Sequence, residues 1–159
     1  MAHRVGLNTA DFDHWGRRFC AGTPDVSGAV GLAAAMNFID SLDRGAIQRH
    51  EQRITDFGLQ RLGRIPGLRL LGPAEATNRI PVFSFDLACV PPEKVMSALD
   101  ADGIAIRAGD LSALPLLTRF GLDAAARASG CLYTTESEID RLGTAIERLA
   151  DSPKSARLS

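Results

Sequence analysis

The sequence has few of the residues that disulfide scaffolds and metal sites require. Its three cysteines form no CxxC pair and are spread along the chain at Cys20, Cys89 and Cys131. This pattern predicts neither a disulfide framework nor a zinc site, and it favours a reducing, cytoplasmic location. His50-Glu51 begins like the HExxH zinc motif, but Ile54 stands where the second histidine belongs. No metal is therefore expected.

Strong charge and long apolar runs are also lacking. The formal net charge is −1, and the charges are mixed along the chain without a basic stripe. The sequence therefore favours neither nucleic acid nor an anionic membrane as a partner. The most apolar run, Ala29 to Ala35, is too short to span a bilayer, and no signal peptide is visible.

The composition is that of one globular domain. Of the 159 residues, 45% are apolar and 23% are charged, which suits a chain with a single core. Residues 1–19 show no sustained periodicity and are predicted to be an arm or linker. Residues 20–150 are predicted to form the domain, and residues 151–159 a loose tail.

Hydrophobic periodicity and turn signals predict the elements of this domain. The predicted helices are 28–39, 43–64, 92–99 and a last helix that opens at the capping box Thr135-Glu136-Ser137-Glu138. The predicted strands are 68–71, 79–87, 104–107 and 127–133. This order predicts an α+β fold, in which a small, mostly antiparallel sheet is covered by helices on one face.

Strand alternation makes Arg107 and Arg127 candidate binding residues. In the predicted strand 127–133, one face carries Arg127, Ser129, Cys131 and Tyr133. If helices cover the apolar face, both arginines project from the open face of the sheet. Two planar guanidinium groups there would suit a carboxylate. The alternative is two surface arginines in ordinary salt bridges.

The AGTPD turn is a second candidate site. Gly22 lets the backbone approach a ligand, Thr23 adds a hydroxyl, and the N-terminus of the following helix favours phosphate. The alternative is an ordinary helix N-cap.

No residue is predicted to be catalytic. Ser112 lies in the loop of the segment IAIRAGDLSALPLL, but no histidine is near it to act as a base, so it is interpreted as a loop residue. The two lysines are Lys94, in a predicted exposed helix, and Lys154, in the predicted tail. Neither setting would activate an amine.

The helix predicted at 28–39 is apolar almost all round. Such a helix is buried on several sides, so it predicts association with a partner surface.

Five segments carry a family resemblance. RRFCAGTPDVSGAVGLAAAMNFID resembles the RF-x-AGTPN-x-xGAIGLGAA segment of class V aminotransferases, in the cysteine desulfurase and selenocysteine lyase branch. The later segments match the C-terminal region of that branch in order and spacing: IPGLRLLGP, NRIPVFSFDL, VMSALDADGIAIRAG and ARASGCLYTTESEIDRL. The resemblance covers about residues 16–150.

The resemblance implies a homodimeric, pyridoxal phosphate (PLP) dependent enzyme of the aspartate aminotransferase fold. This chain is similar only to the linker and the small C-terminal domain. The lysine that binds the cofactor covalently would then belong to a large domain upstream, so this chain alone would not turn over an amino acid. By position, Gly22 and Thr23 match a turn that contacts the cofactor phosphate, typically across the dimer interface. Arg127 matches the arginine that binds the substrate α-carboxylate, and Arg107 the arginine that opens the active-site loop.

The chain departs from the desulfurase pattern in that loop. Desulfurases of this branch read RAGHHCAQP, whereas this chain reads RAGDLSALP, with Asp110, Leu111 and Ser112 in place of His, His and Cys. Thr134 also replaces the asparagine of the usual YNT. A serine hydroxyl does not accept sulfur as a thiolate does, so these departures favour a cysteine-independent reaction, such as transamination, racemisation or C–S or C–Se lyase chemistry.

Two other interpretations remain open. The chain could be a stand-alone, non-catalytic module for dimerisation or small-acid binding. It could also be one half of a split enzyme whose lysine-bearing domain is a separate chain.

Overall fold

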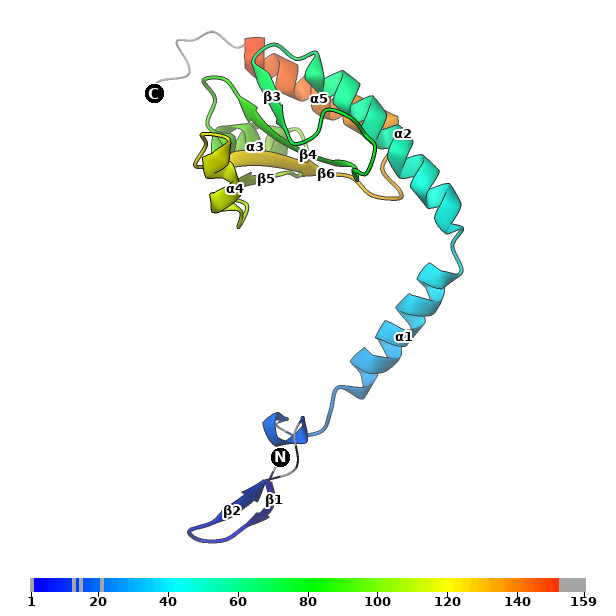
Figure 1. Ribbon diagram of the computed structural model, residues 1–159, viewed down its shortest axis with the longest axis vertical. Coiled ribbons are helices and arrows are strands. Elements are labelled where there is room, and N and C mark those ends of the chain that lie inside the picture. The colour runs from blue at the N-terminus through cyan, green and yellow to red at the C-terminus, as the bar shows by residue number, and fades with distance from the viewer. Residues whose placement is uncertain (1, 13, 15, 21, 152–159) are drawn as a thin grey trace. The chain divides into compact units, whose positions relative to one another are not determined.

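The computed structural model describes residues 2–12, 14, 16–20 and 22–151. The chain divides into two compact units, Met1–Asp43 and Arg44–Ser159, whose elements are labelled in Figure 1. The predicted tail lies outside the described residues apart from Asp151, which ends the last helix.

The first unit contains a hairpin, a short 3-10 turn and one helix. Strands β1 (Ala2–Val5) and β2 (Ala10–Phe12) pair antiparallel, the 3-10 turn is Arg17–Phe19, and helix α1 spans Val26–Asp40. The sequence showed no periodicity over the hairpin. All residues of its two strands are exposed, so no buried face imposes alternation on them.

Helix α1 confirms the predicted helix and extends it by two residues at the N-terminus and one at the C-terminus. It contributes no buried residue. Its large exposed apolar side chains are Val26, Val30, Leu32, Met36, Phe38 and Ile39. The burial that its sequence predicts is therefore not supplied within the first unit.

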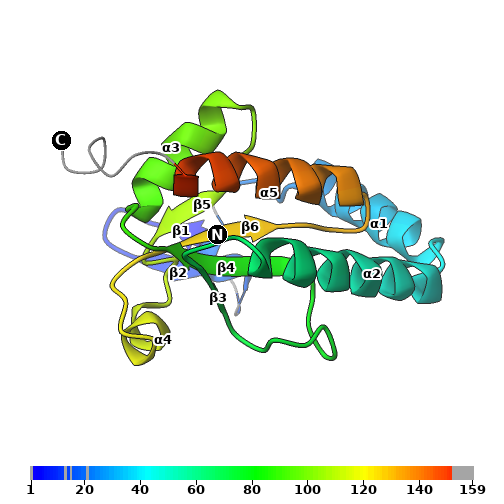
Figure 2. The same ribbon diagram turned by 90° about the horizontal axis from the view of Figure 1, so that it is seen from above.

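The second unit is built on a four-stranded antiparallel sheet. Its strands are β3 (Leu68–Leu71), β4 (Val82–Leu87), β5 (Arg107–Gly109) and β6 (Ala125–Ser129), in the order β3-β4-β6-β5. One face is covered by helices α2 (Arg44–Gly63), α3 (Pro92–Ala101) and α5 (Glu136–Asp151), as Figure 2 shows from above. The predicted α+β fold is confirmed.

The helix-covered face holds the main core. Phe83, Phe85 and Leu87 alternate along β4 as predicted, and all three are buried. They pack with side chains of the three helices, including Ile54 of α2 and Ile146 of α5. Burial of these large apolar side chains is the main driving force for folding of this unit.

The capping box that opens α5 is also confirmed. The backbone N–H of Thr135 donates to the Glu138 carboxylate at 2.8 Å, and the N–H of Glu138 donates to Thr135 Oγ1 at 3.3 Å. The hydrogen bonds from Thr135 hold the pKa of the Glu138 carboxyl below its ordinary value.

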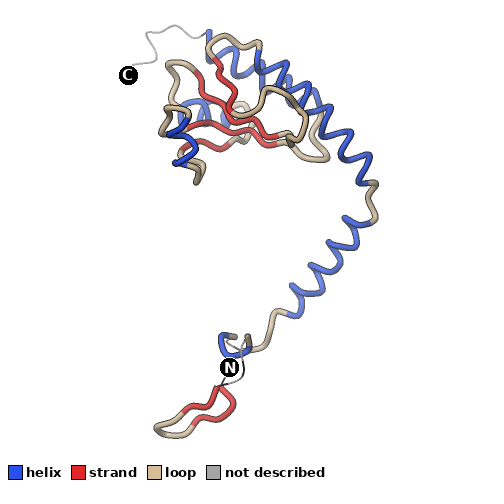
Figure 3. Tube along the Cα trace, in the orientation of Figure 1, coloured by secondary structure: helices blue, strands red, loops and turns tan. Residues whose placement is uncertain are grey.

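The structure adds one short helix that the sequence did not predict. Helix α4 (Leu114–Arg119) follows the loop after β5, and it is drawn beside the strand ends in Figure 3. Its Leu117 packs with Leu71 and Ala125 in a second, small cluster. Ala125 alternates with Ala126 of the main core, so α4 lies on the otherwise open face of the sheet.

The ends of two strands differ from the prediction. Strand β5 begins at Arg107, not at Ile104, because the N–H of Ile104 donates to Leu99 O at 2.9 Å and closes the end of α3. Strand β6 ends at Ser129, because the chain turns immediately after it. The N–H of Cys131 donates to Thr134 Oγ1 at 2.9 Å in this turn.

The predicted placement of Cys131 and Tyr133 on the face of Arg127 is therefore wrong. The predicted strand 79–87 likewise starts later, at Val82, whose carbonyl accepts a hydrogen bond from Arg79 at 3.0 Å.

An ion-pair cluster joins α2 to α5. Arg61 donates to Asp140 at 2.6 Å and to both carboxylate oxygens of Glu147 at 2.7 and 2.8 Å, and its side chain is only 17% exposed. Gly143 lets the guanidinium lie against α5, since a Cβ there would be 2.8 Å from Arg61 Cζ. Bidentate geometry and partial burial make this cluster stronger than an ordinary surface pair.

Glu147 makes this cluster acid-sensitive. Hydrogen bonds from Arg61 hold the pKa of the Glu147 carboxyl below its ordinary value. A lowered pKa contributes stability above the ordinary glutamate pKa of about 4.3, and this contribution is lost as pH falls through the pKa of the folded state. We expect acid to lower the free energy of unfolding more steeply in the wild type than in Arg61→Met, in denaturant unfolding between about pH 7 and about pH 3.

Arg53→Met is the control, because Arg53 forms an exposed pair with Glu136 at 3.3 Å. Equal acid dependence in the wild type and in Arg61→Met would contradict this role of Glu147.

The structure also bears on His50, on membrane-spanning helices and on clusters of metal ligands. His50 Nε2 lies 2.9 Å from Thr134 O, so this histidine links α2 to the turn before α5. In the described part of the chain, no helix combines the length and apolar character needed to cross a membrane. The same residues contain no cluster of three or more His, Cys, Asp or Glu side chains that could hold a metal ion.

Candidate functional site

The sheet register places four side chains in one row across the open face. Leu71 of β3 is opposite Ser84 of β4, Ser84 is opposite Arg127 of β6, and Arg127 is opposite Arg107 of β5. Residues directly opposite each other in an antiparallel pair point to the same face. The prediction that Arg107 and Arg127 share a face is therefore confirmed, and Ser84 and Leu71 continue their row.

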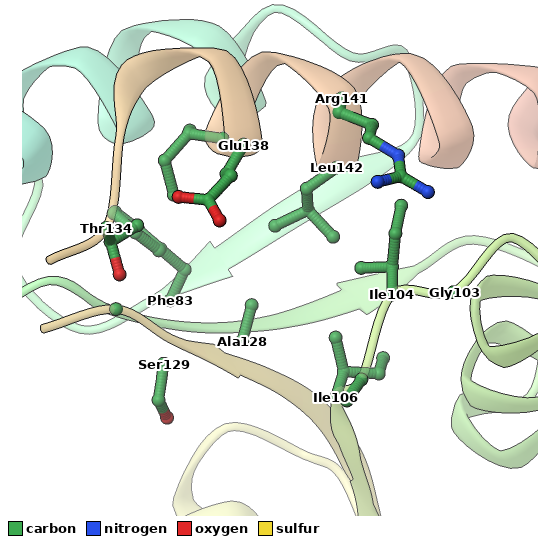
Figure 4. Close-up of a pocket in the computed structure, with 13 residues that line it drawn as sticks. Phe83, Gly103, Ile104, Ile106, Ala128, Ser129, Thr134, Glu138, Arg141 and Leu142 are labelled. Carbon is green, nitrogen blue, oxygen red and sulfur yellow. The ribbon is translucent and has the colours of Figure 1, made fainter.

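This face is the one turned away from α5. Ala126 and Ala128 belong to the core under the helices, so Arg127 between them points the other way. Figure 4 shows this alternation for the next two residues of β6. Ala128 is directed toward Leu142 of α5, whereas Ser129 is directed away from it.

Arg107 and Arg127 carry like charges on directly opposite residues of the sheet. Like charges directly opposite each other destabilise a sheet. On the same face, the neighbouring opposite pair is complementary, with Arg69 facing Asp86. Among the described residues, Nε of Arg127 is the buried side-chain nitrogen or oxygen that has no hydrogen-bond partner. A buried donor without a partner costs free energy that a bound acceptor would recover.

An apolar cavity continues the row beyond Arg127. Its volume is about 330 Å³, and it lies between the open face of the sheet and the α4 segment. The residues that line it are Leu71, Gly72, Pro73, Ser84, Leu111, Ala113, Leu116, Leu117 and Phe120. Its lining combines strands β3 and β4 with the α4 segment, so the sequence pattern did not reveal it.

The loop between β5 and α4 has an unusual backbone. Gly109 has a φ of 116°, and Leu111 and Ser112 have φ values of 53° and 55°. Residues other than glycine rarely adopt such positive φ values. The N–H of Ser112 donates to the Asp110 carboxylate at 2.9 Å, which closes this turn. Such strained residues often occur at functional sites.

Gly22 and Thr23 belong to the first unit and are described there by themselves. Gly22 has a φ of 86° with open space around it, and Thr23 is exposed. Asp25 caps α1 and accepts from the N–H of Gly28 and from Ser27 Oγ, both at 2.8 Å. The Gly28 hydrogen bond, with that from Ser27, holds the pKa of the Asp25 carboxyl below its ordinary value. Asp25 is thus the N-cap residue of α1.

A second cavity, of about 230 Å³, lies on the helix-covered side of the sheet (Figure 4). Its charged lining residues are Glu138 and Arg141. The carboxylate of Glu138 already accepts from Thr135, and Arg141 already donates to the carbonyl of Asp102. These side chains stabilise the fold, so this cavity is a weaker candidate than the open face.

The comparisons with known proteins identify the family. The class V aminotransferase model matches residues 1–142, and the chain belongs to this family. A probable cysteine desulfurase from Streptomyces coelicolor is 38% identical over 149 residues, which cover 94% of this chain and 36% of that relative.

Solved structures share the fold. The apo cysteine desulfurase from Thermococcus onnurineus matches with a TM-score of 0.79 at 28% identity, covering 96% of this chain and 38% of that chain. A variant of C-DES that carries glycine covalently linked to its PLP cofactor matches with a TM-score of 0.56 at 23% identity, covering 86% of this chain and 32% of that chain. This chain thus spans about a third of the length of these relatives.

The described residues fit part of a PLP site. In the second unit, taken by itself, the buried, unpartnered Nε of Arg127 suits the carboxylate of an amino acid. In the first unit, taken by itself, the turn at Gly22 and Thr23 is exposed and could accept a phosphate. The described lysine, Lys94, is exposed on α3, which packs on the helix-covered face. It therefore lies across the sheet from the arginine pair.

Proposed function

We propose that this chain is the small domain of a PLP-dependent class V enzyme and binds the α-carboxylate of its amino-acid substrate. The observation that carries the proposal is the register pairing of Arg107 with Arg127, together with the buried, unpartnered Nε of Arg127. Both guanidinium groups can donate to one carboxylate, and the bound anion relieves the repulsion between them.

The cofactor contacts of this chain are part of the same proposal. Gly22 and Thr23 hold the phosphate group through backbone N–H and hydroxyl donors. When bound, PLP stabilises negative charge on the α-carbon of the substrate. We propose that the lysine that holds PLP covalently belongs to polypeptide outside this chain, because Lys94, the lysine among the described residues, lies on the other side of the sheet from the arginines.

The apolar side chains of α1 support a partner for the first unit. Six large apolar side chains of this one helix are exposed, and exposed apolar patches often mark interaction sites. We propose that the large domain, or a second copy of the chain in a dimer, covers α1.

The loop sequence supports a reaction that needs no thiol on this chain. Ser112 occupies the position of the desulfurase cysteine in the resemblance, and its backbone is held by Asp110. The arginine pair positions the substrate, and the reaction is transamination, racemisation or a lyase reaction that depends on the cofactor.

The direct test is to map acetate binding on this chain. Amide NMR signals are recorded while sodium acetate is added, with sodium chloride of equal ionic strength as the control. We expect acetate-specific shifts centred on β5, on β6 around Arg127 and on Ser84. Shifts centred on the cavity lined by Glu138 and Arg141, or no shift beyond the chloride control, would contradict the proposal.

A further inference from the structure

We infer that the substrate of this site has an apolar side chain, which enters the cavity between the sheet and α4. This inference rests on the proposed function, because it takes the carboxylate on Arg127 as its starting point. It adds the class of amino acid, which neither the family nor the arginine pair defines.

The first step is the position of the cavity relative to the arginine. Ser84 lines the cavity and is directly opposite Arg127. Neighbouring strands are about 5 Å apart, so the cavity begins about one strand spacing from the guanidinium-bearing strand. Leu71, one strand further along the same row, also lines it. A ligand held at Arg127 can therefore extend along the row into the cavity.

The second step is the chemistry of the lining. Ser84 is the only residue with a polar side chain in the cavity's lining as described, and the large side chains are leucines and one phenylalanine. Such a surface gains free energy from burying aliphatic groups, whereas a charged or amide group would lose its bonds to water there.

The third step is size. The volume of about 330 Å³ is at the lower end of the range for small-molecule sites. The site has room for a branched aliphatic or aromatic side chain, and it is larger than the thiol of cysteine requires. Together with Ser112 in the loop, this favours an apolar amino acid as the substrate.

The mouth of the cavity offers a residue for mutation. Leu116 lines the cavity and is 54% exposed, so a polar residue there should not unfold the protein. Leu114 lies on the same helix with 47% exposure but does not line the cavity. Leu116→Gln and Leu114→Gln are therefore a matched pair.

The experiment measures the dissociation constants of three carboxylates for the 159-residue chain by NMR titration. The probes are acetate, 4-methylpentanoate and succinamate, which has nearly the shape of 4-methylpentanoate but ends in an amide. Each buried methylene group strengthens binding by about four-fold. We expect 4-methylpentanoate to bind at least about ten-fold more tightly than acetate, and succinamate to bind no more tightly than acetate. Leu116→Gln should remove most of the advantage of 4-methylpentanoate, and Leu114→Gln should retain it.

The outcomes separate this inference from the proposed function. If acetate and 4-methylpentanoate bind equally well and both need Arg127, the apolar site is wrong and the carboxylate site stands. Succinamate binding as tightly as 4-methylpentanoate, or an unchanged preference in Leu116→Gln, also overturns the apolar site alone. If Arg127→Gln leaves acetate binding unchanged, both the proposed function and this inference fail.

Discussion

Replacing Arg127 with glutamine is expected to weaken acetate binding by about 10-fold to 100-fold, because a hydrogen bond to a charged group contributes about 1.5–3 kcal/mol. Arg127 lies within the row, between Ser84 and Arg107. Its Nε is buried without a partner in the protein. Affinity is measured by NMR titration of the wild type and the variant.

Two further variants define what Arg127 contributes. Arg127→Lys keeps the charge but lacks the planar fork, so we expect it to bind acetate more weakly than the wild type. Arg64→Gln changes the net charge equally at an exposed position after α2 and should bind acetate normally. Equal affinities in the wild type and in Arg127→Gln would contradict the role of Arg127.

The stability of Arg127→Gln separates binding from structure. The substitution removes a like-charge pair, so the free energy of unfolding should stay the same or rise by about 0.2–1 kcal/mol. If the role of Arg127 were only structural, the substitution would lower the free energy of unfolding.

The largest expected loss of stability comes from Gly58→Ala in α2. A Cβ at Gly58 would lie 2.3 Å from Cζ and 2.6 Å from Cε1 of Phe83, whose side chain is completely buried. Overpacking a well-filled core costs about 1–3 kcal/mol and sometimes more. This contact is among the closest that a new methyl group could make, so we expect a loss of about 3 kcal/mol, measured by denaturant unfolding.

Gly63→Ala is the matched control on the same helix. Its Cβ would meet only Leu70 Cδ1, at 4.0 Å, and its φ is not positive. Alanine is intrinsically better than glycine in a helix by up to about 1 kcal/mol, so this variant should be as stable as the wild type or more so. Equal stability of Gly58→Ala and Gly63→Ala would contradict the packing described for Phe83.

The sequence predicted those parts of the second unit that have one buried face. Phe83, Phe85 and Leu87 alternate because one side of β4 meets the helices, and this alternation is visible in the sequence. The same period-two argument placed Arg107 and Arg127 on one face, even though both strands begin and end at other residues than predicted. The prediction of a shared face was correct because it depends only on the alternation of side chains along each strand, and not on where the strand begins or ends.

Other features left no comparable signal in the sequence. The β1–β2 hairpin has no buried residue, so nothing in its sequence alternates. Helix α4 has only six residues, fewer than two turns, which is too short for a helical period to be recognised. The cavity is lined by two strands and the α4 segment, which are separated in the sequence. Only the sheet register shows that Ser84 is opposite Arg127 and that Leu71 is opposite Ser84.

A double-mutant cycle on acetate binding tests the central claim most directly, namely that Arg107 and Arg127 hold one carboxylate together. The affinities of the wild type, Arg107→Gln, Arg127→Gln and the double variant give the coupling free energy between the two side chains. We expect the double variant to bind only slightly more weakly than Arg127→Gln, with a coupling of about 1 kcal/mol or more. Additive losses would show that the two arginines act independently and would contradict this account.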